Sequence, residues 1–191
     1  MAATNPIRSK KQVHDLAQHF LTKNQPRNHL LIVLGVHTAL RISDMLRLTW
    51  NSVYDFKRGN VRNCVTIAEA KTNKPKTFKL NRKVAEALVL LHGSLNPQSA
   101  EPLFKNLRTG NAISRIQAYR IIRAASESLE LERVSCHSLR KTFGYHAWKS
   151  GVPVAVIMEI YNHSSFAVTR RYLGISQDDK NAVYHKLGKV L

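Results

Sequence analysis

The sequence has few acidic side chains and few cysteines. Its 191 residues include 12 Asp+Glu against 30 Lys+Arg, which gives a formal net charge of +18 at pH 7. The two cysteines, Cys64 and Cys136, allow at most one disulfide and match no zinc-site spacing. No apolar run approaches the roughly 18 residues of a membrane span, and the first residues lack the apolar stretch of a secretory signal. We therefore expect a soluble, cytoplasmic and very basic domain.

The positive charge is spread along the whole chain. Residues 1–95 carry a net charge of +11 and residues 96–191 a net charge of +7, so no tail holds the surplus. A hydrophobic content of 43% excludes a disordered polycation and indicates a buried core. Nucleic acid is the favoured partner because each neutralised phosphate releases counterions. A membrane surface fits less well, since no helix joins a basic face to a strong apolar face; a high-pI protein without a nucleic-acid site remains open.

Hydrophobic spacing predicts a mostly helical domain. A first helix over residues 9–23 has Ser9 as its N-cap, a second over 25–40 is apolar nearly all round, and Ser43 caps a short third helix. Further helices are expected over 82–93, 114–129, 137–151, 153–161, 165–173 and 176–187, the last with Ser176 as its cap. Between them, alternating segments at 52–56, 64–70 and 77–80 predict three short strands. The fold class is therefore α+β, with a small three-stranded antiparallel sheet.

Five residues stand out as able to act on a phosphodiester. Arg41 lies where a hydrophobic helix stops, His137 and Arg140 are three residues apart, and His163 and Tyr172 are nine apart. Guanidinium groups bind phosphate oxygens bidentately, and a tyrosine can act as a nucleophile. No carboxylate cluster that could hold magnesium accompanies them. Each residue alone also has an ordinary interpretation, such as a helix-capping charge for Arg41 or a half-buried core aromatic for Tyr172.

Three ordered motifs carry a resemblance to a known family. TALRISDML, HSLRKTF and NHSS…TRRY resemble the arginine and histidine–tyrosine boxes of tyrosine recombinases, the phage integrase family. The resemblance covers the chain from about Arg8 to its C-terminus. It departs at Lys141, commonly histidine, and at Asn162, often glycine. Most integrases also carry a separate DNA-binding domain, and the chain resembles members that lack it, so residues 1–191 are expected to form one catalytic domain.

The resemblance implies a chemical role for each matching residue. Tyr172 would attack the scissile phosphate and form a 3′-phosphotyrosine, while Arg41 and Arg140 would clamp the non-bridging oxygens. A lysine in the turn between the second and third strands would protonate the leaving 5′-oxygen, and Lys71 matches this position best. Two neighbours in the same turn remain alternatives for this role, Lys74 and Lys76.

The two histidines would assist this reaction. The resemblance implies that His137 helps proton transfer and that His163 hydrogen-bonds the phosphate. Asp44 could orient Arg41 or simply lie in the first turn of its helix. Neither a metal, nor ATP, nor any other cofactor is required, because the phosphotyrosine conserves the bond energy.

The resemblance also implies partners. We expect double-stranded DNA, a monomer free in solution and a homo-tetramer on paired sites, with the protein on the nucleoid when bound. The segment 176–191 would dock onto a neighbouring subunit or, equally, pack on its own domain; its apolar contacts would be Ala182, Val183, Leu187 and Val190. The alternatives are a nicking-closing activity, a metal-dependent nuclease, and a catalytically silent DNA-binding or regulatory protein on the same fold.

Overall fold

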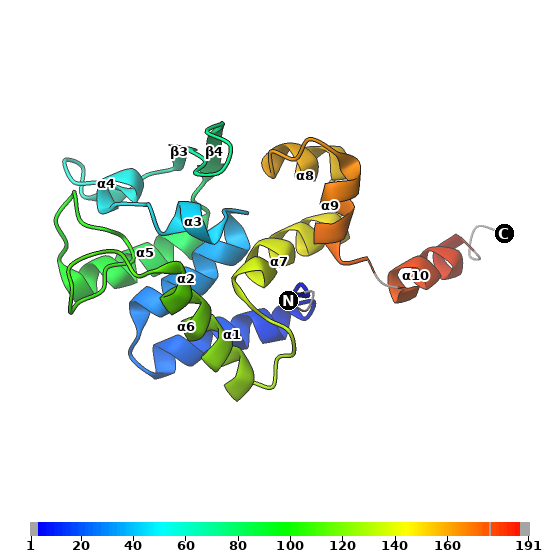
Figure 1. Ribbon diagram of the computed structural model, residues 1–191, viewed down its shortest axis with the longest axis horizontal. Coiled ribbons are helices and arrows are strands. Elements are labelled where there is room, and N and C mark those ends of the chain that lie inside the picture. The colour runs from blue at the N-terminus through cyan, green and yellow to red at the C-terminus, as the bar shows by residue number, and fades with distance from the viewer. Residues whose placement is uncertain (1–3, 176, 188–191) are drawn as a thin grey trace.

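A buried helix, α2 (Pro26–His37), organises the fold. The computed structural model describes residues 4–175 and 177–187, without the side chains of residues 178, 186 and 187. Residues 28 to 36 of α2 are all buried, and α2 packs against α1 (Lys10–Thr22), α5 (Arg82–Leu95) and α7 (Cys136–Lys149) (Figure 1). A Cβ on Gly35 would lie 2.7 Å from Leu139 Cδ1 of α7. Glycine at this position therefore permits the close approach of the two helices.

Within the described residues, two helix starts follow the predicted capping residues and a third does not. The Ser9 hydroxyl accepts a hydrogen bond from Gln12 N at the start of α1, and Ser114 forms a capping box at the start of α6 (Arg115–Ser128). Ser43, predicted as an N-cap, instead lies inside α3 (Ile42–Met45), whose N-cap is Arg41. Arg41 is the last residue with an extended backbone, so the helix begins two residues earlier than predicted.

The predicted three-stranded sheet is instead two separate antiparallel hairpins. β1 (Tyr54–Asp55) pairs with β2 (Asn60–Val61), and β3 (Cys64–Ala68) pairs with β4 (Pro75–Lys79). The first predicted strand is shortened because its opening residues belong to a helical turn, α4 (Trp50–Val53), which holds the fully buried Trp50. Two residues of strand remain there, and among the described residues they pair with β2. The prediction of an α+β, mostly helical fold is confirmed.

A second, smaller core lies beside the main one. It is formed by α7, α8 (Val154–Ile160) and α9 (Phe166–Leu173), and its fully buried members are Ala39, Ile157, Tyr161 and Leu173. α7 contributes Leu139 to the main core and Phe143 to the second core. The site described below lies where these two cores meet.

The last helix extends away from both cores. α10 (Gln177–Leu187) points outward at one end of the molecule (Figure 1), and an ion pair of 2.6 Å joins Lys149 Nζ of α7 to Asp179 Oδ1. Val183 and Tyr184 are 55% and 73% exposed. The predicted cap Ser176 and the predicted contact Val190 lie outside the described residues. None of the helices in the described part of the chain combines the length and the apolar character needed to cross a bilayer.

Candidate active site

Arg41 is held at the entrance to the site by a buried carboxylate. Its side chain is 20% exposed, and its Nη1 lies 2.6 Å from Glu69 Oε1, on a side chain with no exposed surface. Two residues earlier, Ala39 has a left-handed backbone with φ of 56°, uncommon for a residue other than glycine. Because Ala39 turns the chain after α2 ends at His37, Arg41 does not continue that helix and instead lies beside Glu69.

Arg140 is buried between the two cores. It is 2% exposed, and its Nη1 and Nη2 donate to the carbonyl oxygens of Ala39 (2.5 Å) and Tyr161 (2.9 Å). Its guanidinium carbon lies 4.5 Å from the centre of the Tyr161 ring, a cation–π geometry. Burial and, after it, the charge of Arg41 lower the pKa of Arg140, but a guanidinium stays protonated in proteins. Two of its five N–H groups are occupied by these carbonyls, which leaves donors for an anion.

His163 and Tyr172 lie against Arg140. The Tyr172 ring centre is 4.9 Å from that of His163 and 5.8 Å from the guanidinium carbon of Arg140. His163 Nδ1 is 3.1 Å from Thr169 Oγ1, and the same hydroxyl lies 3.5 Å from the carbonyl oxygen of Ser165. Burial, followed by the charges of Arg140, Arg41 and Lys76, lowers the pKa of His163 to about 4. The imidazole is therefore neutral at physiological pH.

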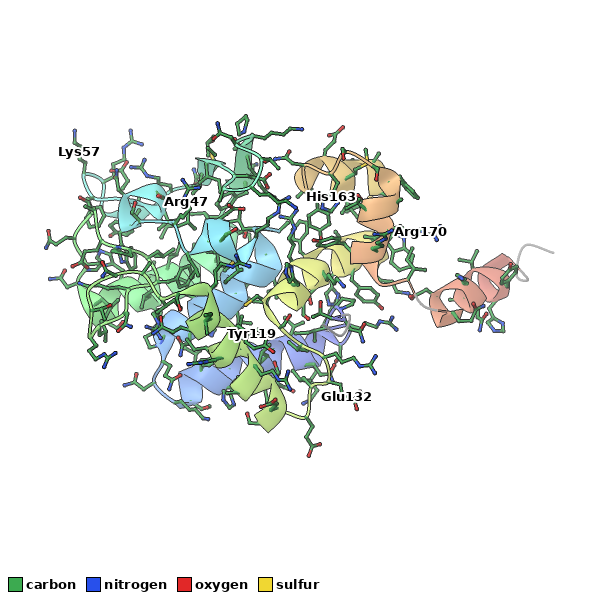
Figure 2. The ribbon with its side chains drawn as sticks, viewed as in Figure 1. Arg47, Lys57, Tyr119, Glu132, His163 and Arg170 are labelled. Atoms are coloured by element: carbon green, nitrogen blue, oxygen red, sulfur yellow. The ribbon has the colours of Figure 1, made fainter. Side chains whose placement is uncertain are left out.

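His137 lies at the edge of this cluster. It is an exposed residue in the first turn of α7, one helical turn before Arg140. Partial burial and the charges of Lys141, Arg115 and Arg140 lower its pKa. The structure thus brings Arg41, Arg140, His163 and Tyr172 together from four segments, and it places His137 beside them; Figure 2 shows His163 at the end of α8.

The three candidate lysines have different environments. Lys71 and Lys74 are exposed in the turn between β3 and β4, whereas Lys76, on β4, is 5% exposed. Lys76 Nζ donates to the carbonyl oxygens of Ile160 (2.6 Å) and Ala39 (3.3 Å). Burial and then the charge of Arg140 lower its pKa to about 8. Lys76 therefore lies within the arginine cluster, and Lys71, the best sequence match, lies outside it.

Two residues of the cluster, Glu69 and Tyr161, were not predicted as part of it, and a third, Lys76, was predicted only as an alternative to Lys71. Glu69 pairs with Arg41, Lys76 binds the carbonyl that also accepts from Arg140, and the Tyr161 hydroxyl donates to Arg140 O at 2.6 Å. Asp44 Oδ1 accepts from Ala70 N at 2.8 Å, so it supports the turn rather than Arg41. A lone Glu in a basic turn and a Tyr two residues before His163 give only weak signals, because both roles depend on long-range contacts.

The fold and the cluster define a basic, mostly helical domain in which arginine, histidine and tyrosine side chains from separate segments lie together. The family model "Phage integrase family" matches residues 8–178, so the chain belongs to this family. It is 36% identical over 188 residues to the probable integrase/recombinase YoeC of Bacillus subtilis (strain 168), and the match covers 98% of this chain and 99% of that protein. It is also 26% identical to the tyrosine recombinase XerC of Herpetosiphon aurantiacus, covering 87% of this chain and 55% of that protein.

Solved structures share the fold. A crystal structure of XerA recombinase superposes with a TM-score of 0.77 at 19% identity, covering 95% of this chain and 63% of that one. A structure of XerH bound to palindromic difH substrate, in a post-cleavage complex, superposes with a TM-score of 0.74 at 20% identity. The match covers 96% of this chain and 53% of the XerH chain. The chain thus matches nearly the full length of YoeC and about half the length of the Xer proteins.

Proposed function

We propose that this protein is a site-specific DNA recombinase or integrase that cuts and rejoins duplex DNA through a 3′-phosphotyrosine at Tyr172. The observation that carries the proposal is that the Tyr172 ring centre lies 4.9 Å from the His163 ring centre and 5.8 Å from the guanidinium carbon of Arg140. In the reaction, Tyr172 Oη forms a bond to phosphorus and the bond to the 5′-oxygen breaks. The 5′-hydroxyl of a partner strand then attacks the phosphotyrosine and releases Tyr172, so the number of phosphodiester bonds is unchanged.

Two guanidinium groups neutralise the charge that develops on the non-bridging oxygens. Arg41 is partly exposed and directed by Glu69; Arg140 is fixed by two carbonyl oxygens. This fixed geometry supports the proposal because preorganised donors need little rearrangement in the transition state. In this proposal the neutral His163 carries its ring proton on Nε2 and donates it to a phosphate oxygen, and His137 assists proton transfer.

Lys71 supplies the proton to the leaving 5′-oxygen in this proposal. It is exposed at the tip of a turn and can reach a DNA strand laid over the cluster. Lys76 is a poorer general acid because its ammonium donates to two carbonyl oxygens in the interior. We assign it instead to holding the β3–β4 hairpin against the end of α8.

A covalent adduct tests the proposal. Incubation with fragmented DNA from the source genome, followed by denaturation and sequencing of protein-linked DNA, is expected to give adducts at discrete sites, and Tyr172→Phe is expected to give none. An adduct with Tyr172→Phe contradicts the assignment of Tyr172. DNA binding without any adduct would instead favour a catalytically silent regulator, and loss of cleavage with EDTA would favour a metal-dependent nuclease.

A substrate with a better leaving group tests whether Lys71 is the general acid. In a duplex whose scissile 5′-oxygen is replaced by sulfur, the leaving thiol needs no general acid, since a thiol loses its proton far more readily than an alcohol. Lys71→Ala is expected to cleave normal DNA about 100-fold more slowly than wild type, in the range of general acid catalysis, and to cleave the sulfur substrate at nearly the wild-type rate. Lys76→Met serves as the matched control; rescue of Lys76→Met and not of Lys71→Ala would reassign the general acid.

We further propose that the protein is a monomer in solution, acts in the cytoplasm on nucleoid DNA, and forms a tetramer on paired sites. The exposed Val183 and Tyr184 of α10 and its outward direction (Figure 1) support docking onto a neighbouring subunit over packing on its own domain.

A further inference from the structure

Glu69 is a buried carboxylate at the junction of three segments that carry predicted catalytic groups. It is 1% exposed and lies at the end of β3, immediately before the turn that holds Lys71. A carboxylate is rarely buried this completely unless it is paired. The contacts of the Glu69 carboxylate therefore indicate what it does.

The first contact is with Arg41. The ion pair of 2.6 Å joins Glu69 Oε1 to one nitrogen of the guanidinium, and the Arg41 side chain keeps 20% of its surface exposed while Glu69 exposes none. The carboxylate thus lies beneath the guanidinium, on the side away from solvent. Because Glu69 is inaccessible from outside, it cannot occupy the place of a phosphate; it can only fix the direction of Arg41.

The other contacts reach the lysine turn and the histidine loop. Glu69 Oε2 accepts from Thr72 Oγ1 at 2.8 Å, and Thr72 is the residue after Lys71. Asn162, next to His163, has a buried Nδ2 that makes no hydrogen bond in the described part of the chain, and it lies near enough to Glu69 to help lower the pKa of that carboxyl. Although burial raises the pKa of Glu69, the ion pair with Arg41, the hydrogen bond from Thr72 and the nearby Asn162 amide hold that pKa below its usual value, so the group is charged at neutral pH.

We propose that Glu69 is a positioning residue of the recombinase reaction, which directs Arg41 toward the scissile phosphate and couples it to the Lys71 turn and the His163 loop. The inference rests on the proposed function above. In this inference, Glu69 acts through the positive charge that Arg41 presents to a negatively charged phosphate. Removing the charge of Glu69 should therefore matter only when the phosphate itself carries charge.

A neutral scissile group tests this dependence. We compare single-turnover cleavage of a duplex bearing the mapped site with cleavage of the same duplex carrying a methylphosphonate at the scissile position. Glu69→Gln is expected to slow cleavage of the normal phosphodiester at least 10-fold and that of the methylphosphonate less than 3-fold, with unchanged DNA affinity. Glu69→Asp is expected to recover part of the rate. Glu86→Gln removes an exposed carboxylate of α5 and is the matched control, expected to cleave both substrates at the wild-type rate.

If Glu69→Gln slowed cleavage of both substrates equally, the inference would be overturned, because equal losses indicate general damage to the fold. An unchanged cleavage rate on both substrates would overturn it as well. A wild-type protein that forms no adduct at all would instead overturn the proposed function. Even without an adduct, hydrogen exchange of the free protein tests whether Glu69 couples the Lys71 turn to the His163 loop. In Glu69→Gln, the amides of residues 70–74 and of residues 162–165 are both expected to exchange faster than in wild type and in Glu86→Gln. Unchanged exchange in either segment would overturn the coupling.

Discussion

At the scale of single residues, His163 links the chemistry of the site to the stability of the fold. Its low pKa has physical causes in the same cluster: burial first, and then the charges of Arg140, Arg41 and Lys76. An imidazole that is neutral when folded and has a pKa of about 6.5 when unfolded makes stability depend on pH. Between about pH 6.5 and 4 the unfolded chain binds a proton that the folded protein does not, so stability falls as the pH falls.

We therefore expect His163→Gln to reduce the acid sensitivity of the protein. The wild-type free energy of unfolding should fall more steeply between pH 7 and pH 5 than that of the variant, by at most about 1 kcal/mol per pH unit after solvent screening. Urea unfolding at the two pH values measures this difference. His14→Gln, on an exposed part of α1, controls for the substitution itself. Parallel curves for wild type and His163→Gln would contradict the lowered pKa.

Gly144 and Tyr161 form a second residue-scale pair. A Cβ on Gly144 would lie 2.3 Å from the Tyr161 hydroxyl oxygen, and that hydroxyl donates to Arg140 O. Gly144→Ala is expected to destabilise the protein by about 1–3 kcal/mol, as overpacking does, and to slow adduct formation because Tyr161 supports Arg140. In the double variant with Tyr161→Phe, the missing hydroxyl removes the closest contact and leaves one of 3.0 Å to the ring, so the combined loss should be smaller than the sum of the two single losses. Additive losses measured by denaturant unfolding would contradict the steric explanation.

At the scale of elements, hairpins and helix ends determine the positions of the candidate catalytic side chains. The β3–β4 hairpin is a small element, yet it carries Glu69, Lys71 and Lys76 to three different environments. Alternation along β4 buries Lys76 and Phe78 on one face, as the two-residue period of a strand requires. The alternating pattern predicted this hairpin. It could not indicate that Lys76 faces the carbonyl oxygens of Ala39 and Ile160, because those residues are 37 and 84 positions away.

The outward direction of α10 leads to a prediction at this scale. Protein truncated after Ile175 should keep its fold, with a melting temperature within about 4 °C of wild type, because α10 points away from both cores and an ion pair to a partly exposed lysine contributes about 1 kcal/mol or less. It should bind a single DNA site normally and fail to assemble on paired sites in gel filtration. Lys149→Met, which removes the ion pair to Asp179 and keeps the helix, is the matched control. A large fall in melting temperature would indicate that α10 packs on its own domain.

At the scale of the whole molecule, the net charge of +18 predicts strong salt dependence of DNA binding. A protein that neutralises six to ten phosphates loses about 10³–10⁵ in affinity between 50 and 200 mM salt, and we expect at least a 100-fold loss here. Fluorescence anisotropy with a labelled duplex measures it. Arg41→Ala should lower the slope of log affinity against log salt by about one phosphate contact while greatly slowing adduct formation. A slope below 2 for wild type would contradict binding through a spread basic surface.

The sequence by itself determined the helical fold class, the positions of most helices, the basic surface, and the residues Arg41, His137, Arg140, His163 and Tyr172 as a set. These depend on local spacing, capping and ordered motifs, which are properties of neighbouring residues along the chain. The tertiary structure alone decided that the expected single sheet is two hairpins, that Lys76 lies within the arginine cluster and Lys71 outside it, and that Glu69 pairs with Arg41. The physical reason is distance along the chain: a buried charge is tolerated only where partners from other segments meet it, and no local pattern encodes which segments those are.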